Sequence, residues 1–308
     1  MFTERLVRLV SAPGGLAYAL LAAVIVMIWL GVGRPSTPPA AAVPTARPVQ
    51  DASAITLRPD TAPDAPLIGP EQAISSVRRF VGDPSLPLEA GLQSDLVGAG
   101  AMDLYYLESL IPTRGEDFFK VDARTGEVVE ATLRGHLAPT NPPIDLGPAE
   151  SEQTAARFAA DRFFGFSALQ LVDRASRTSE NNHIYSFKWS EIAADSGAEL
   201  PVSVSIAVSA GSGEVVWYLA QRDLLQVDPR PSIDRARAIR AATGGLGASA
   251  SRWDTGRPSA VRLQVLYDED NEQQLVWSIT FRSRQEGTRP TLRVLVDAHS
   301  GQLIAGPS

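Results

Sequence analysis

The stretch FKVDARTGEVVEA, residues 119–131, decides the fold, because it is typical of two short strands joined by a tight turn. Two later stretches repeat its pattern, SIAVSAGSGEVVWYL at residues 205–219 and RVLVDAHSGQLIAG at residues 293–306. The turn glycines Gly126, Gly213 and Gly301 are spaced by 87 and 88 residues. Self-similarity at a fixed period indicates repeated structural units, so the sequence predicts three of them.

The three turns use the same local chemistry. Each begins with a side chain that can accept hydrogen bonds from backbone N–H groups two or three residues later, and each contains a glycine that can adopt a positive φ. The turn residues are Asp122, Thr125 and Gly126; Ser209, Ser212 and Gly213; and Asp297, Ser300 and Gly301. Hairpin geometry accounts for all of them, so we interpret them as structural rather than catalytic.

A helical pattern precedes the strands of each unit. Apolar residues recur at helical spacing in residues 71–81, 150–164 and 232–243, and strands with alternating apolar residues follow. One helix on a small antiparallel sheet is an α+β unit. We therefore expect three tandem units of this kind, at residues 70–147, 148–229 and 230–308.

Residues 16–33 (LAYALLAAVIVMIWLGVG) are an uncharged, nearly continuous apolar run. A helix of this length can cross most of a hydrocarbon layer about 30 Å thick. Arg5 and Arg8 precede the run, and basic residues favour the cytoplasmic side. The sequence thus predicts a single-pass anchor within residues 1–34, with the rest of the chain extracytoplasmic. The alternatives are a cleaved signal peptide, which Ala40, Ala41 and Ala42 would suit, and a buried soluble helix.

Nine prolines fall within residues 35–70, among many alanines and few large apolar residues. Such a composition cannot bury a core and favours an extended, solvated chain. Residues 35–69 are therefore expected to be a linker.

Composition excludes several function classes. The chain has no cysteine, which excludes disulfides, thiol catalysis and cysteine metal sites. Its net charge is −7 and it has no clustered basic run, so it lacks the footprint of a nucleic-acid binder. His136, His183 and His299 are far apart in the sequence, which disfavours a histidine-rich metal centre.

The hairpin motif resembles that of the PepSY domain. Residues 121–128 (VDARTGEV) and 296–303 (VDAHSGQL) fit its closing hairpin, while the middle copy has Ser209 where an aspartate is expected. The resemblance extends over residues 70–306. It implies a non-enzymatic role without catalytic residues. PepSY domains occur in peptidase propeptides, in membrane-anchored Gram-positive germination proteins with tandem repeats, and in envelope regulators of sensor kinases.

A search for catalytic motifs agrees with that implication. The sequence contains no His-Glu-x-x-His, Gly-x-Ser-x-Gly, phosphate-loop or Ser-x-x-Lys motif. Residues 268–272 (DEDNE) are the densest carboxylate cluster, but they lack the glycine and the ligand spacing of a calcium loop, so we expect a solvated hairpin tip without Ca²⁺. No cofactor is predicted.

Trp217 and Tyr218 are adjacent on a strand, so one of them is expected to face outward as a candidate partner contact.

Three function classes stay open. The first is a membrane-anchored extracytoplasmic protein that docks a peptidase, a cell-wall hydrolase or a sensor kinase without being an enzyme itself, for instance by pairing a partner strand with an open sheet edge. The second is an envelope hydrolase with an Asp/Glu site, and the third is a structural spacer. We favour the first.

Overall fold

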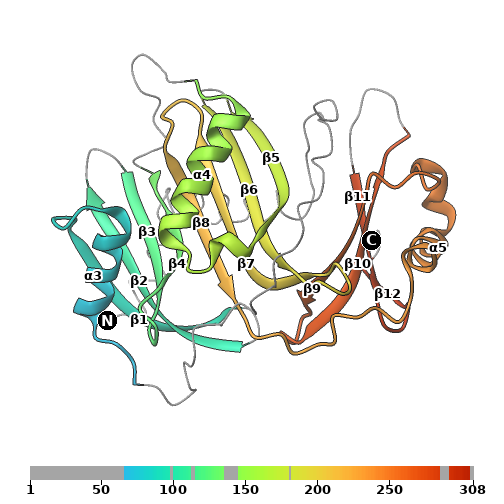
Figure 1. Ribbon diagram of the computed structural model, residues 1–308, viewed down its shortest axis with the longest axis horizontal. Coiled ribbons are helices and arrows are strands. Elements are labelled where there is room, and N and C mark those ends of the chain that lie inside the picture. Colours follow the sequence, from blue (N-terminus) through green and yellow to red (C-terminus); the bar gives the residue numbers. More distant parts are fainter. Residues whose placement is uncertain are drawn as a thin grey trace. The chain divides into compact units, whose positions relative to one another are not determined.

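The computed structural model describes residues 66–97, 100–111, 115–134, 145–179, 182–284 and 291–305 (Figure 1). In this part of the chain three α-helices and twelve strands follow one another. The helices are α3 (Pro70–Val81), α4 (Pro148–Arg162) and α5 (Arg235–Gly245), with short 3₁₀ turns η2 (Phe166–Ala168) and η3 (Gly247–Arg252). The strands are β1 (Leu88–Val97), β2 (Gly100–Ile111), β3 (Gly115–Asp122), β4 (Val128–Thr132), β5 (Gln170–Ser179), β6 (Asn182–Ile192), β7 (Glu199–Ser209), β8 (Val215–Arg222), β9 (Ala260–Tyr267), β10 (Gln273–Arg282), β11 (Thr291–Asp297) and β12 (Leu303–Ala305).

The described residues form two compact units. The larger unit consists of residues 66–230 together with 264–275, and the smaller unit consists of residues 231–263 together with 276–305. The chain therefore passes between the units three times, once before α5, once within β9 and once within β10. The expected division at residues 70–147, 148–229 and 230–308 stays a prediction.

The expected fold class, three units with one helix on a small sheet each, is wrong. The twelve strands are connected into one mixed sheet in the order β1-β2-β3-β4-β8-β7-β9-β10-β11-β12, with β6 also pairing with β7 and β5 with β6. Neighbours are antiparallel in the pairings that join β1 to β8, and β7 and β9 pair in parallel through Glu199 and Gln264. Small separate sheets are thus absent from the described residues.

The pairing of β4 with β8 joins the strands β1–β4 and β5–β8 into one sheet. Both are closing strands of the repeated hairpin, and each has its neighbour in that hairpin on one side only, β3 for β4 and β7 for β8. Glu130 pairs with Leu219, Ala131 with Tyr218 and Thr132 with Trp217. An open strand edge is a template for pairing, so two such edges satisfy each other's backbone groups. Alternation of apolar residues cannot predict this pairing, because it indicates which face of a strand is buried and not which strand lies beside it.

In the larger unit, α3 and α4 cover one face of the sheet (Figure 1). The helix α3 buries Ala73, Val77 and Phe80, and α4 buries Ala155 and Ala159. These side chains share one apolar core with inward-facing residues of the strands, including Phe119, Val121, Ile206 and Tyr218. The core therefore lies between the helices and the sheet.

The smaller unit has a core of its own. Ile233, Ala238, Ala242 and Leu246 pack with Ile279, Phe281, Val294 and Val296 of β10 and β11. The helix α5 is capped at its start by Asp234, whose carboxylate accepts a hydrogen bond from the Arg237 N–H at 2.7 Å.

None of the helices within the described residues is long and apolar enough to cross a membrane. The apolar run at residues 16–33 and the Pro-rich stretch at residues 35–65 lie outside the described residues, and so does His136.

Candidate functional site

The first hairpin turn is closed by Asp122. Its Oδ1 atom accepts hydrogen bonds from the backbone N–H groups of Arg124 (2.7 Å) and Thr125 (3.1 Å). Thr125 Oγ1 in turn accepts from the Glu127 N–H at 3.1 Å, and Gly126 has φ of +73°. All three turn residues are thus occupied in holding the turn.

The second turn has the same arrangement with a serine. Ser209 Oγ accepts from the Ser212 N–H at 3.2 Å, Ser212 Oγ accepts from the Glu214 N–H at 3.3 Å, and Gly213 has φ of +71°. In this turn a hydroxyl replaces the carboxylate, and Ser209 is fully buried, with 0% of its surface exposed. A charge would be costly to bury there, which explains why the middle copy departs from the aspartate.

The third turn is closed by Asp297. Its Oδ1 atom accepts from the His299 N–H (3.0 Å), the Ser300 N–H (2.6 Å) and the Ser300 hydroxyl (2.8 Å), and Gly301 has φ of +80°. Burial raises the pKa of Asp297, but the hydrogen bonds from Ser300 and His299 outweigh it and hold the pKa below its ordinary value. The turn therefore stabilises the charged carboxylate.

Each turn also fixes the start of a helix. The backbone N–H of Ile68 donates to the Ala123 carbonyl at 2.7 Å, that of Leu146 to Ala210 at 3.0 Å, and that of Ile233 to Ala298 at 3.1 Å. In each case the donor precedes the N-cap residue, and the acceptor follows the first turn residue. The hairpin and the helix start are thus locked together by the same contact at three places.

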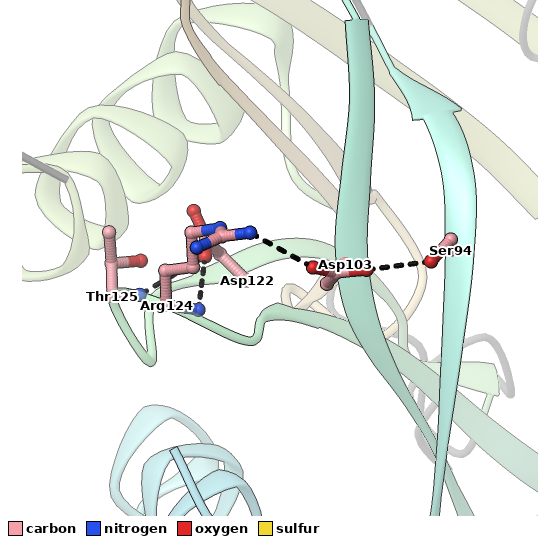
Figure 2. A network of polar contacts seen from close by, with 5 residues as sticks. All are labelled: Ser94, Asp103, Asp122, Arg124 and Thr125. Atoms are coloured by element: carbon pink, nitrogen blue, oxygen red, sulfur yellow. Dashed lines mark hydrogen bonds and ion pairs between the residues drawn. The ribbon is translucent and has the colours of Figure 1, made fainter. Parts of the chain in front are cut away.

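A polar network connects the first turn to the edge of the sheet (Figure 2). Arg124 donates from its Nη2 atom to Asp103 Oδ2 at 3.2 Å, and Ser94 donates its hydroxyl to Asp103 Oδ1 at 2.6 Å. Ser94 lies on β1, opposite Asp103 on β2. Side-chain contacts through Arg124, Asp103 and Ser94 therefore connect the first turn with β2 and β1.

The strand β1 ends the sheet within the described residues. All ten of its residues pair with β2 in unbroken register, from Leu88 opposite Ser109 to Val97 opposite Gly100, and no other described strand pairs with it. Leu92 is 51% exposed. A regular, unpaired edge with an exposed apolar side chain can accept an added strand.

A pocket of about 270 Å³ lies on the helix-covered face of the larger unit. Its walls come from α3, the first turn, the end of α4 and β8. Three arginines line it, Arg79, Arg162 and Arg222, together with the carboxylates Glu127 and Asp161. The charged groups come from four separate elements, so no sequence spacing predicts this pocket. The only sequence signal is Glu127, which is part of the hairpin motif.

Aromatic rings and carbonyls orient two of these arginines. The Arg162 guanidinium lies 5.2 Å from the ring centroid of Phe158, and its Nε donates to the Phe80 carbonyl at 2.8 Å. The Arg222 guanidinium stacks 3.7 Å from the centroid of Phe163 and donates from Nη2 to the Phe164 carbonyl at 2.7 Å. Both side chains are therefore preorganised.

Trp217 and Tyr218 do not have the expected arrangement. Both are buried, with 5% and 2% of their surface exposed, so neither presents an outward face to a partner. Tyr218 packs edge-on against Phe80 at 5.1 Å and against Phe158 at 5.9 Å, beneath the two helices. Burial raises the pKa of its hydroxyl well above the ordinary value. Adjacent residues on a strand point to opposite faces of the sheet, and at Trp217 and Tyr218 the side chains on both faces are buried.

The carboxylate cluster at residues 268–272 forms a hairpin turn between β9 and β10. Asp268 Oδ1 accepts from the N–H groups of Asp270 and Glu272, each at 2.9 Å, and Gln274 donates to Oδ2 at 2.7 Å. The Asp268 carboxylate thus serves the turn. No group of His, Asp and Glu side chains suited to a metal ion is found within the described residues.

Comparison with known proteins places one segment in a family. Residues 259–306 match the model of PepSY, described as "Peptidase propeptide and YPEB domain". The chain is similar to the YpeB C-terminal domain of Bacillus megaterium, at 16% identity and a TM-score of 0.49, covering 78% of this chain and 97% of that one. A candidate lipoprotein from Clostridium difficile 630 has 11% identity and a TM-score of 0.20, covering 51% and 90%. No curated protein matches the chain.

Proposed function

We propose that this protein is an extracytoplasmic, non-enzymatic regulatory protein that docks an extended segment of a partner protein along β1. The observation that carries the proposal is the outer edge of β1, with which no other described strand pairs and which is ten residues long and regular. Main-chain hydrogen bonds along such an edge supply affinity, and alternate side chains supply specificity. The PepSY segment at residues 259–306 makes the protein one that contains a PepSY domain, which supports a binding or regulatory role.

The other edge strand of the larger unit, β5, is less suited to the addition of a partner strand. The outer strand β5 also pairs with one neighbour, β6, but its register is broken between Leu171 and Asp173. Its Arg174 is ion-paired with Glu152 at 2.7 Å. A bulge protects an edge against pairing, and β1 has an unbroken register instead.

A peptidase is the first partner class to consider, because the matching family is described as a peptidase propeptide domain. Cell-wall hydrolases and sensor kinases are the other classes that the hairpin resemblance implies. Docking along β1 would control such a partner sterically, by holding one of its extended segments. This mechanism needs no catalytic group in the chain.

The proposal is tested by photocrosslinking in intact cells. A photoreactive phenylalanine analogue replaces Leu92 on β1, and the matched control carries it at Leu224, which is 65% exposed and lies outside the strands. We expect position 92 to give a covalent adduct with one envelope protein, identified by mass spectrometry, and position 224 to give none. Leu92→Lys should abolish co-purification of that protein, whereas Leu224→Lys should not. Equal adducts from both positions would contradict docking on β1.

A further inference from the structure

The geometry points to the arginine pocket as a binding site for the carboxylate of an acidic peptide. This inference concerns a different surface from β1 and does not depend on the docking proposed there. Three arginines against two carboxylates leave the pocket with an excess of positive charge, although the whole chain carries a net charge of −7. A local reversal of sign in an acidic protein selects anionic ligands.

The arginines are suited to a planar anion. Guanidinium groups recognise carboxylates through paired N–H donors, and a site is strongest when the donors are fixed before the ligand arrives. Arg162 and Arg222 are fixed in this way by aromatic rings and by the carbonyls of Phe80 and Phe164. Arg79, on the exposed side of α3, adds a third cation at the pocket's wall.

Two of these arginines lie at ion-pair distance from the pocket's own carboxylates. Glu127 Oε2 is 3.5 Å from Arg222 Nε, and Asp161 Oδ2 is 3.8 Å from Arg162 Nη1. Both distances exceed the roughly 2.7–2.9 Å of a strong charge-assisted hydrogen bond. An incoming carboxylate competes with Glu127 for the Arg222 guanidinium. Glu127 then acts as an internal competitor that sets how tightly the ligand binds.

The floor and size of the pocket favour a peptide group over a larger ligand. Phe80 and Tyr218 line the pocket, and the Tyr218 hydroxyl is a potential hydrogen-bond donor. A volume of about 270 Å³ lies just below the lower end of the range for drug-sized ligands, roughly 300–1,000 Å³. One acidic side chain, or a chain terminus with its last residue, is an appropriate occupant.

The test measures binding of a fluorescein-labelled tetraglutamate peptide to the full chain by fluorescence anisotropy at low ionic strength. Arg79→Gln should weaken binding by about two- to fivefold, which is the range of an exposed ion pair. Glu127→Gln should strengthen it by about the same factor, because it removes the competitor. The matched control is Arg157→Gln on α4, which removes the same charge from an exposed residue outside the pocket wall and should leave binding unchanged.

Three results would overturn the inference: equal weakening by Arg79→Gln and Arg157→Gln, no strengthening by Glu127→Gln, or displacement of the peptide by an equal concentration of inorganic phosphate. Thermal unfolding of each variant shows whether the fold is kept. Amidating the peptide's C-terminus identifies which carboxylate binds. Retained binding assigns an acidic side chain, and lost binding assigns the chain terminus. Either result supports the site. A failure here would leave crosslinking through position 92 unaffected.

Discussion

At the scale of single residues, the turn carboxylates are the groups whose role follows most directly from their contacts. Asp297 accepts three hydrogen bonds from the two residues that follow it by two and three positions. The sequence predicts such bonds because Asx turns depend only on local spacing. The pocket arginines could not be predicted in this way, because Arg79, Arg162 and Arg222 meet only after three distant elements have packed.

Replacing Asp297 should destabilise the protein in a pH-dependent way. We expect Asp297→Ala to lower the free energy of unfolding by about 1–2 kcal/mol at pH 7, as for the loss of a capping side chain. The folded-state pKa of Asp297 is lowered, so its charge-dependent stabilisation is present above the ordinary value of 3.8 and is lost as the pH falls through the folded-state pKa. Urea unfolding at pH 7 and near pH 2 measures this.

The control for this prediction is Asp297→Asn, which keeps an acceptor oxygen but removes the charge. The difference in stability between the wild type and Asp297→Asn should shrink toward zero at the acidic end. A difference that stays constant across that range would show that the carboxylate's charge contributes nothing to the turn.

At the scale of elements, the helices and the closing hairpins were predicted well and the sheet was not. The pattern predicts helices at residues 71–81, 150–164 and 232–243, and the structure has Pro70–Val81, Pro148–Arg162 and Arg235–Gly245. Helical periodicity is contained within one segment, so it can be recognised locally. Pairing of β4 with β8 joins residues about 90 positions apart, such as Ala131 and Tyr218, and no local pattern specifies it.

Side-chain packing at the start of α5 can be tested at Ile233. This residue is 3% exposed, donates its N–H to the Ala298 carbonyl, accepts from Trp277 Nε1 at 3.1 Å, and packs beside Gly301. Ile233→Ala should lower the free energy of unfolding by about 2–4 kcal/mol, because it leaves a cavity under α5. Urea unfolding measures this loss, and hydrogen exchange of the α5 amides assigns it to the smaller unit.

Ile304→Ala is the matched control, since Ile304 is 41% exposed on β12. It should change stability by less than about 1 kcal/mol. Similar losses from Ile233→Ala and Ile304→Ala would mean that packing of the Ile233 side chain is not what holds α5 in place.

At the scale of the whole molecule, the order of residues along the chain does not follow the two compact units. Residues 264–275 comprise the end of β9, the turn after it and the start of β10. They belong to the larger unit although they follow α5 of the smaller one. Within the larger unit, Tyr267 donates its hydroxyl to Asp223 Oδ2 at 2.7 Å, and Gln273 donates to the Leu224 carbonyl at 2.7 Å. Residues beyond position 230 therefore contribute contacts to the larger unit.

Tyr267→Phe should consequently destabilise the larger unit, by about 1–2 kcal/mol for one hydrogen bond to a charged acceptor. Burial and the bond to Asp223 raise the pKa of Tyr267 above its ordinary value of 10, so its stabilisation is present below pH 10 and is lost as the pH rises through the folded-state pKa. The difference in unfolding free energy between the wild type and Tyr267→Phe should thus be constant from pH 6 to about pH 9 and decrease above about pH 10.

Hydrogen exchange locates the effect: amides of residues 221–226 should exchange faster in the variant. Unchanged exchange there would mean that the larger unit is complete without residues 264–275.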